Sequence, residues 1–143
     1  MTFQKILVPY DGSSFSDRAF KAALDLAQKY DSKITIVSCI DIFSSRWFGK
    51  SGFEQLILKK LRGKIMKEIQ DLEKIAKKRN VPTKGRIFET VTLTKTLVTF
   101  AKSNKIDLIV IGSRGQSGLK ELFLGSISNG IIQRAQCPVL VVK

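Results

Sequence analysis

Four short apolar runs, separated by longer amphipathic stretches, constrain the fold of this chain more than any other feature. The runs are Ile6-Leu7-Val8, Ile34-Thr35-Ile36-Val37, Leu108-Ile109-Val110-Ile111 and Val139-Leu140-Val141-Val142. Strands that are apolar on both faces are typical of parallel sheets covered by helices on each side. A weaker strand is predicted at about residues 85–91, where Arg86 and Glu89 interrupt the apolar pattern, so we place it at an edge of the sheet.

Between these runs the apolar residues recur with the period of amphipathic helices. Ser14, with Asp17 three residues later, resembles a capping box at the start of the first helix. A long apolar stripe from Phe53 to Leu72 predicts a second helix, and shorter stripes predict helices near 93–101 and 127–135. This alternation predicts an α/β fold, a doubly wound sheet of five parallel strands with helices on both faces. The length of 143 residues fits a single domain, 1–143.

The composition excludes several kinds of site. The chain has no histidine, which rules out Ser-His-Asp and Cys-His catalysis and histidine-ligated metals. Its two cysteines, Cys39 and Cys137, are too few for a four-cysteine metal site and are typical of a reducing compartment. No basic leader and no apolar run of membrane-spanning length are found, so we expect no membrane span and a cytoplasmic location.

The glycine pattern Gly112-Ser113-Arg114-Gly115, then nine residues, then Gly125-Ser126 is the most informative motif. It runs from the end of a predicted strand to the start of a predicted helix. Gly112 is expected to turn the chain sharply, while Gly115 and Gly125 let an anion approach the backbone. The N–H groups of Gly125, Ser126 and Ile127 favour phosphate at the helix N-terminus, with help from the Ser126 and Ser128 hydroxyls and Arg114.

Other phosphate-binding motifs are missing from the sequence. There is no Gly-x4-Gly-Lys-Ser/Thr, and no Gly-x-Gly-x-x-Gly follows the first strand. The alternative is that the glycines only allow the turns of a loop and bind no phosphate. The spacing, the serine and the strand-to-helix context together favour phosphate binding.

The sequence resembles the universal stress protein (UspA-like) family over nearly its whole length. The resemblance rests on Lys5-Ile6-Leu7-Val8-Pro9 with Asp11, on residues 107–115, on Gly125-Ser126 and on residues 137–142. The Gly-x2-Gly-x9-Gly-Ser pattern is the specific element, because it marks the ATP-binding branch. The resemblance implies strand order 3-2-1-4-5, a homodimer, and ATP at the carboxyl ends of the strands.

The resemblance also assigns roles to individual residues. Pro9 and Asp11 follow the first strand, with Asp11 on the ribose hydroxyls, and the backbone of Cys39 reads the adenine. Ile111 and Gly112 line the base and ribose. The phosphates are assigned to Arg114, Gly115, Gly125, Ser126, Ile127 and Ser128. As alternatives, Asp11 is a turn carboxylate and Cys39 is a core thiol.

Two departures from the family stand out. Many relatives have histidine where this chain has Ser38; because the adenine contact is made by the backbone, we expect little change. The segment from Phe43 to Gly52, with Trp47 and Phe48, is either an aromatic lid over the base or a patch that packs on a partner subunit.

Charge and the final strand suggest partners. The chain carries a formal charge of +13, most of it within Lys50–Arg86, so this stretch is either a solvated surface or a secondary polyanion-binding surface.

In the order 3-2-1-4-5, the run Val139–Val142 is an edge strand, and antiparallel pairing with its own copy protects it, which predicts a homodimer.

We expect a nucleotide-binding stress-response or signalling module rather than an enzyme. The alternatives are a slow Mg-dependent ATPase or phosphotransferase, with Asp11 or Asp41 assisting Mg, and a protein that binds no nucleotide and acts through its basic surface. Phosphoryl transfer needs a group that orients the nucleophile, and neither a histidine, nor a Walker lysine, nor paired carboxylates stand out for that task.

Overall fold

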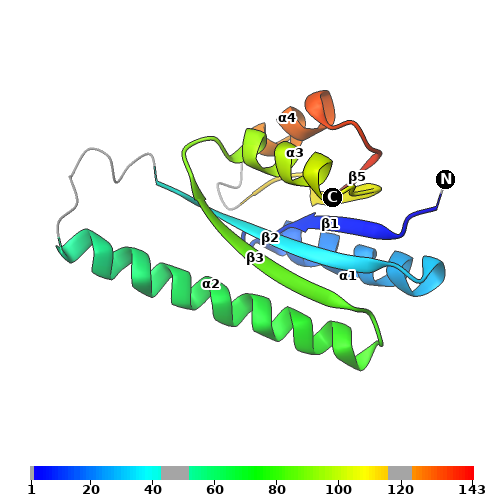
Figure 1. Ribbon diagram of the computed structural model, residues 1–143, viewed down its shortest axis with the longest axis horizontal. Coiled ribbons are helices and arrows are strands. Elements are labelled where there is room, and N and C mark those ends of the chain that lie inside the picture. The colour runs from blue at the N-terminus through cyan, green and yellow to red at the C-terminus, as the bar shows by residue number, and fades with distance from the viewer. Residues whose placement is uncertain (1, 43–51, 116–123) are drawn as a thin grey trace.

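The computed structural model describes residues 2–42, 52–115 and 124–143. Strands and helices alternate along the chain, as labelled in Figure 1: β1(Lys5–Pro9), α1(Ser14–Tyr30), β2(Lys33–Asp41), α2(Gly52–Lys78), β3(Thr83–Thr90), α3(Leu93–Ser103), β4(Leu108–Gly112), α4(Ser126–Arg134) and β5(Val139–Val142). The strands form one sheet in the order β3-β2-β1-β4-β5, and every pair is parallel. The predicted fold class, the strand order and the edge position of β3 are therefore confirmed.

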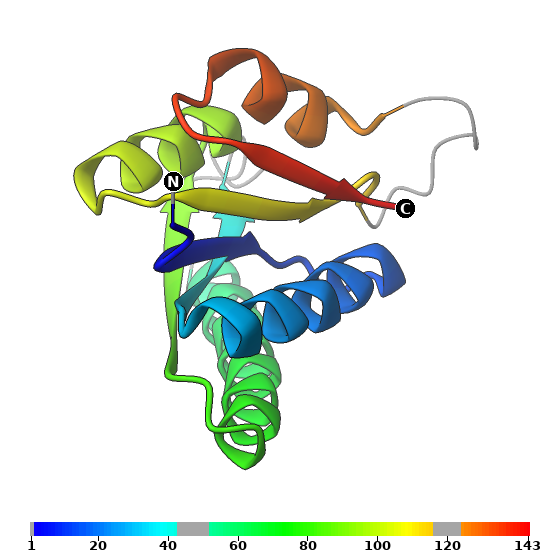
Figure 2. The same cartoon turned by 90° about the vertical axis from the view of Figure 1, so that its right-hand side faces the viewer.

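The sheet divides the core into two halves, with α1 and α2 on one face and α3 and α4 on the other (Figure 2). Alternate residues of β1 show the division: Ile6 and Val8 pack with the first helix pair, whereas Leu7 packs with the second. All three side chains are fully buried, which explains why this run is apolar without interruption.

Helix α1 begins one residue earlier than the sequence predicted. Its N-cap is Ser13, not Ser14, and the Ser13 hydroxyl accepts a hydrogen bond from the Ser16 N–H at 3.1 Å. Ser16 therefore occupies the third helical position that the prediction had given to Asp17. Asp17 instead accepts a hydrogen bond from the Tyr10 hydroxyl at 2.5 Å, which joins the first turn of α1 to the end of β1.

Helix α2 is buried only toward its C-terminal end. Ile69, Leu72 and Ala76 pack against the sheet, whereas the first turns carry the exposed apolar side chains Phe53 and Leu56. The lysines of the predicted basic surface that lie on this helix are also exposed; they are Lys59, Lys60, Lys64, Lys67, Lys74, Lys77 and Lys78. Their binding to polyanions stays a prediction. No described helix is long and apolar enough to span a membrane.

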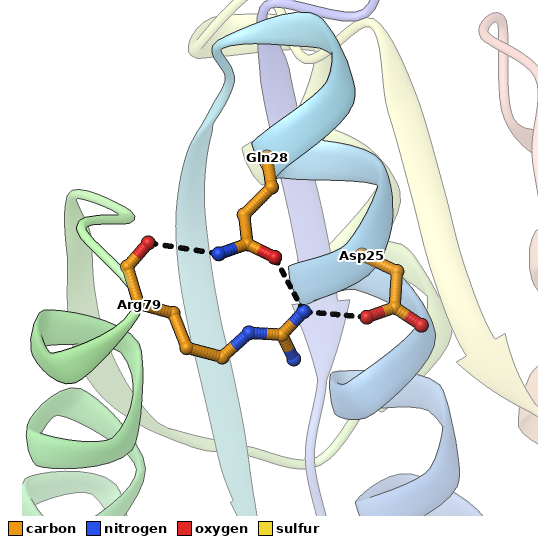
Figure 3. A network of polar contacts seen from close by, with 3 residues as sticks. All are labelled: Asp25, Gln28 and Arg79. Carbon is orange, nitrogen blue, oxygen red and sulfur yellow. Dashed lines mark hydrogen bonds and ion pairs between the residues drawn. The ribbon is translucent and has the colours of Figure 1, made fainter.

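A polar network ties the C-terminal end of α2 to α1 (Figure 3). The Arg79 guanidinium contacts Asp25 Oδ1 and Gln28 Oε1, both at 2.5 Å. The Gln28 amide in turn donates a hydrogen bond to the Arg79 carbonyl at 3.0 Å. The two neighbouring helices are thus joined at the end of the sheet opposite the carboxyl ends of the strands.

Candidate functional site

A cavity of about 470 Å³ opens at the carboxyl ends of β1, β2 and β4. This is where the strand order reverses, since β2 and β4 lie on opposite sides of β1, and ligands of doubly wound sheets bind at such a point. All eleven site residues predicted from the sequence line it. They are Pro9, Asp11, Cys39, Ile111, Gly112, Arg114, Gly115, Gly125, Ser126, Ile127 and Ser128.

The N-terminus of α4 forms one end of the cavity. The first intrahelical bond of α4 runs from the Asn129 N–H to the Gly125 carbonyl at 2.9 Å. The N–H groups of Ser126, Ile127 and Ser128 therefore have no acceptor within the helix, and the helix dipole adds partial positive charge. This end, which Arg114 also lines, suits an anion.

Two of the predicted phosphate donors are used inside the protein. The Gly125 N–H donates to the Ser113 carbonyl at 2.8 Å, and the Ser128 hydroxyl donates to the Gly112 carbonyl at 2.7 Å. These two groups therefore already have acceptors inside the protein, and their part in phosphate binding stays a prediction. They hold the β4–α4 connection in place, and the first turn of α4, the Ser126 side chain and Arg114 line this side of the cavity.

Gly112 has a different role from the one predicted. It is the last residue of β4 and not a left-handed turn; among the described glycines it is Gly12 that has a positive φ, of 83°. A Cβ on Gly112 would lie 2.8 Å from the backbone carbon of Phe15. Glycine is needed here because α1 packs directly against the end of β4.

Phe15 also makes a cation–π contact with Arg114. The Arg114 Cζ lies 5.4 Å from the centre of the Phe15 ring, and the Arg18 Cζ lies 4.7 Å from the same ring. Arg18 donates a hydrogen bond through Nε to the Lys143 carbonyl at 2.9 Å. Each cation–π contact contributes about 0.5–1 kcal/mol at an exposed site. The ring therefore helps to orient the guanidinium that lines the cavity.

Asp11 follows β1 and lines the cavity. Its Oδ1 accepts the Ser13 N–H at 2.9 Å, which is the turn role considered as the alternative. Its Oδ2 faces the second glycine of the motif, because a Cβ on Gly115 would lie only 2.6 Å from it. The carboxylate thus stabilises the β1–α1 turn and also lines the cavity.

The other end of the cavity is mainly apolar. It is lined by Val37 and Cys39 of β2, by Leu93 and Leu97 of α3, and by Ile111. Burial raises the pKa of the Cys39 thiol to about 11, so this side chain is neutral at pH 7. A lining of this kind suits a flat, uncharged group.

Ser38, where many relatives are expected to have histidine, faces away from the cavity. It is buried, and its hydroxyl donates to the Tyr10 carbonyl at 2.9 Å. Ser38 therefore joins β2 to the residue after β1. The proposed lid at Phe43–Gly52 lies, apart from Gly52, outside the described residues.

Comparison with known proteins identifies the family. Residues 2–143 match the profile of the Universal stress protein family. The chain belongs to that family. It is 33% identical over 141 residues to universal stress protein MJ0531 of Methanocaldococcus jannaschii, covering 99% of this chain and 82% of that protein. It is also 33% identical to universal stress protein YxiE of Bacillus subtilis, covering 99% of each.

Solved structures share the fold. The structure of hypothetical protein MJ0577 superposes with a TM-score of 0.89 at 26% identity, covering 100% of this chain and 97% of that one. A universal stress protein in complex with cAMP gives 0.71 at 23% identity, covering 99% and 98%. One from Archaeoglobus fulgidus in complex with dAMP gives 0.69 at 20% identity, covering all of both chains.

Six further residues line this cavity: Tyr10, Ser16, Val37, Asp41, Leu93 and Leu97. The sequence analysis named Asp41 only as a carboxylate that assists Mg in the ATPase alternative, and it did not name the other five. The period of the strand gave a signal for two of them, since residues 37, 39 and 41 point to the same face of β2. Leu93 and Leu97, four residues apart on α3, share a helix face in the same way.

Proposed function

We propose that this universal stress protein is an ATP-binding stress-response or signalling module. The observation that carries the proposal is the division of the cavity, with an anion-binding end at α4 and an apolar slot between β2 and α3. An adenine nucleotide has the same two parts. Two structures of universal stress proteins, one in complex with cAMP and one in complex with dAMP, support the same ligand class.

In this proposal the triphosphate lies along the β4–α4 connection. It contacts Arg114, Gly115 and the N-terminal turn of α4 from Gly125 to Ser128. Asp11 accepts hydrogen bonds from the ribose hydroxyls, while Pro9, Cys39, Ile111 and Gly112 surround the sugar and base. If Mg²⁺ binds with the nucleotide, Asp11 would supply a protein carboxylate for it, and the ion would neutralise phosphate charge.

The protein acts by binding rather than by turnover in this proposal. A nucleotide changes the state of such a module only if it binds two conformations unequally. Weak hydrolysis is measured directly, by incubating the protein with Mg²⁺ and ATP. Turnover at enzyme-like rates that disappears in Asp11→Ala would instead make the protein an ATPase.

The partner in the proposed homodimer is a second copy paired along β5. This strand is an edge strand of the sheet that pairs with β4 on one side, and its Leu140 side chain is 40% exposed. An uncovered apolar edge strand is satisfied by antiparallel pairing about a twofold axis. Light scattering at micromolar concentration is expected to give twice the mass of one chain, and a monomer mass would contradict the pairing.

Calorimetric titration with ATP and with adenosine tests the nucleotide proposal. Removing a charged donor costs about 1.5–3 kcal/mol, so Arg114→Ala is expected to weaken ATP binding about 10- to 100-fold and adenosine binding little. Arg134→Ala is the matched control, because Arg134 lies in the last turn of α4. Wild-type protein that does not bind ATP at millimolar concentration would refute the proposal.

A further inference from the structure

The first half of α2, residues 52–67, exposes several large apolar side chains. Those on its first turns are Phe53, which is 72% exposed, Leu56, Ile57 and Leu61. Figure 1 shows that these turns extend beyond the ends of the strands, whereas the buried side chains of the helix lie in its second half. Single exposed apolar residues are normal on a protein surface, but a group of neighbouring ones marks an interaction site.

Positive charge is concentrated in the same half of the helix. Residues 52–67 carry five basic side chains and one acidic side chain, whereas residues 68–78 carry three of each. Arg62 is directed to β3, where it pairs with Glu89 at 3.4 Å. The other four basic residues are exposed and form no ion pair with another described residue; they are Lys59, Lys60, Lys64 and Lys67. The charge excess of α2 is therefore confined to the half with the exposed apolar side chains.

The helical spacing places these lysines among the apolar side chains. Phe53, Ile57 and Leu61 are each four residues apart, so they follow one ridge of the helix. Lys60 and Lys64 come three residues after Ile57 and Leu61, which places them beside this ridge. The four lysines and the four apolar residues named above thus form one exposed surface, which we call the α2 patch.

A lipid surface with anionic headgroups matches both features of the α2 patch. Lysines near such a surface are attracted to its negative charge, while apolar side chains enter the boundary between headgroups and acyl chains. Duplex nucleic acid would satisfy the lysines through its phosphates but would leave Phe53 and Ile57 without an apolar partner. Two α2 patches facing each other would bring lysines against lysines, and such juxtaposition of like charges is unfavourable.

We propose that the α2 patch is a docking surface for membranes that contain anionic lipids. The first half of α2 lies in the plane of the headgroups, with its lysines on the negative charges and its apolar side chains inserted between the lipids. This inference is independent of the proposed nucleotide binding, because it rests on a different surface of the molecule.

Co-sedimentation with lipid vesicles tests the docking directly. One set of vesicles is an equal mixture of phosphatidylserine and phosphatidylcholine, and the other is phosphatidylcholine alone. Wild-type protein is expected to bind the mixed vesicles at least about tenfold more tightly than the neutral ones, because the lysines contribute only where the surface is negative. Salt at 1 M is expected to remove most of this preference, since it screens exposed charges.

The lysines are tested with two double variants that remove the same charge. Lys60→Gln combined with Lys64→Gln is expected to weaken binding to mixed vesicles about 30-fold, at about fivefold for each lysine near the surface. Lys74→Gln combined with Lys77→Gln is the matched control, because these exposed lysines lie in the second half of α2. The control is expected to weaken binding less than about threefold.

The apolar side chains are tested with a second matched pair. Ile57→Ser is expected to weaken binding to mixed vesicles about tenfold, because the side chain no longer leaves water when the helix docks. Ile75→Ser is the control: Ile75 is 47% exposed, against 48% for Ile57, but lies in the second half of α2. It is expected to change binding less than about twofold. Because both side chains are exposed, both variants are expected to unfold in urea near the wild-type midpoint.

Three results would overturn the proposal. The first is wild-type protein that does not bind mixed vesicles or binds neutral ones equally well. The second is binding of duplex DNA that the Lys60 and Lys64 variant loses and Ile57→Ser keeps, without any vesicle preference, which would assign the α2 patch to nucleic acid. The third is a lower mass of Ile57→Ser in light scattering, which would assign it to a contact between two copies of the chain.

Discussion

The close packing of β4 on α1 predicts that Gly112→Ala destabilises the protein. The added Cβ would lie 2.8 Å from two Phe15 atoms, its backbone carbon and its Cβ, about 0.6 Å short of the 3.4 Å at which ordinary contact begins. Because one of these is a main-chain atom, no side-chain rotation relieves the clash. Overpacking of this kind costs about 1–3 kcal/mol. The stiffer unfolded chain returns about 0.4–1 kcal/mol, which leaves a net loss of up to about 2.6 kcal/mol.

Urea unfolding followed by circular dichroism measures this loss as a lower midpoint at an unchanged slope. Gly63→Ala is the matched control, because a Cβ there meets no atom within 4 Å in the middle of α2. That variant is expected to gain up to about 1 kcal/mol from helix propensity. If both variants shift the midpoint upward by similar amounts, the argument from the Phe15 contact is refuted.

Three further predictions test the site and the helix pair. Phe15→Leu removes the ring beneath Arg114 and is expected to weaken ATP binding about two- to fivefold but adenosine binding little, whereas equal losses in calorimetry would contradict the positioning role. In a Cys137→Ser background, alkylation of Cys39 by iodoacetamide is expected to accelerate about tenfold per pH unit up to a pKa of about 11, and a plateau near pH 9 would contradict it. Because the folded state raises this pKa, the contribution of Cys39 to stability is complete below pH 9 and declines as the pH rises toward 11. Asp25→Ala is expected to lower the free energy of unfolding by less than about 1 kcal/mol, with a smaller loss in 1 M NaCl; a loss that salt does not change would exclude screening of the Arg79 ion pair as its basis.

The fold could be predicted from the sequence because each strand has a strong local pattern. Continuous apolar runs such as Ile6-Leu7-Val8 indicate strands covered on both faces, and their alternation with helical stripes leaves few topologies. In β3, Arg86 and Glu89 interrupt the apolar pattern, and this indicated that β3 lies at an edge of the sheet. The position of the cavity also follows from the topology. Parallel strands have their carboxyl ends at the same end of the sheet, and this brings Asp11, Cys39 and Gly112 together.

The details that could not be predicted depend on contacts between distant parts of the chain. The pattern around Gly125 shows that a helix begins there, but only the folded chain places the Ser113 carbonyl where it accepts the Gly125 N–H. The need for glycine at position 112 likewise comes from Phe15, which the sequence places far away. Local choices such as Ser13 over Ser14 as the N-cap are nearly equal in propensity, so packing decides between them.

Ser113 joins two parts of the molecule through its own peptide groups. Its N–H donates to the Val142 carbonyl of β5, and its carbonyl accepts the N–H of the N-cap residue of α4, both at 2.8 Å. Ser113 therefore contacts both the edge strand β5 and the start of α4. If a bound nucleotide strengthens the association of two chains by some factor, thermodynamic reciprocity requires association to tighten nucleotide binding by that same factor. Measuring ATP affinity as a function of protein concentration would reveal this mutual dependence.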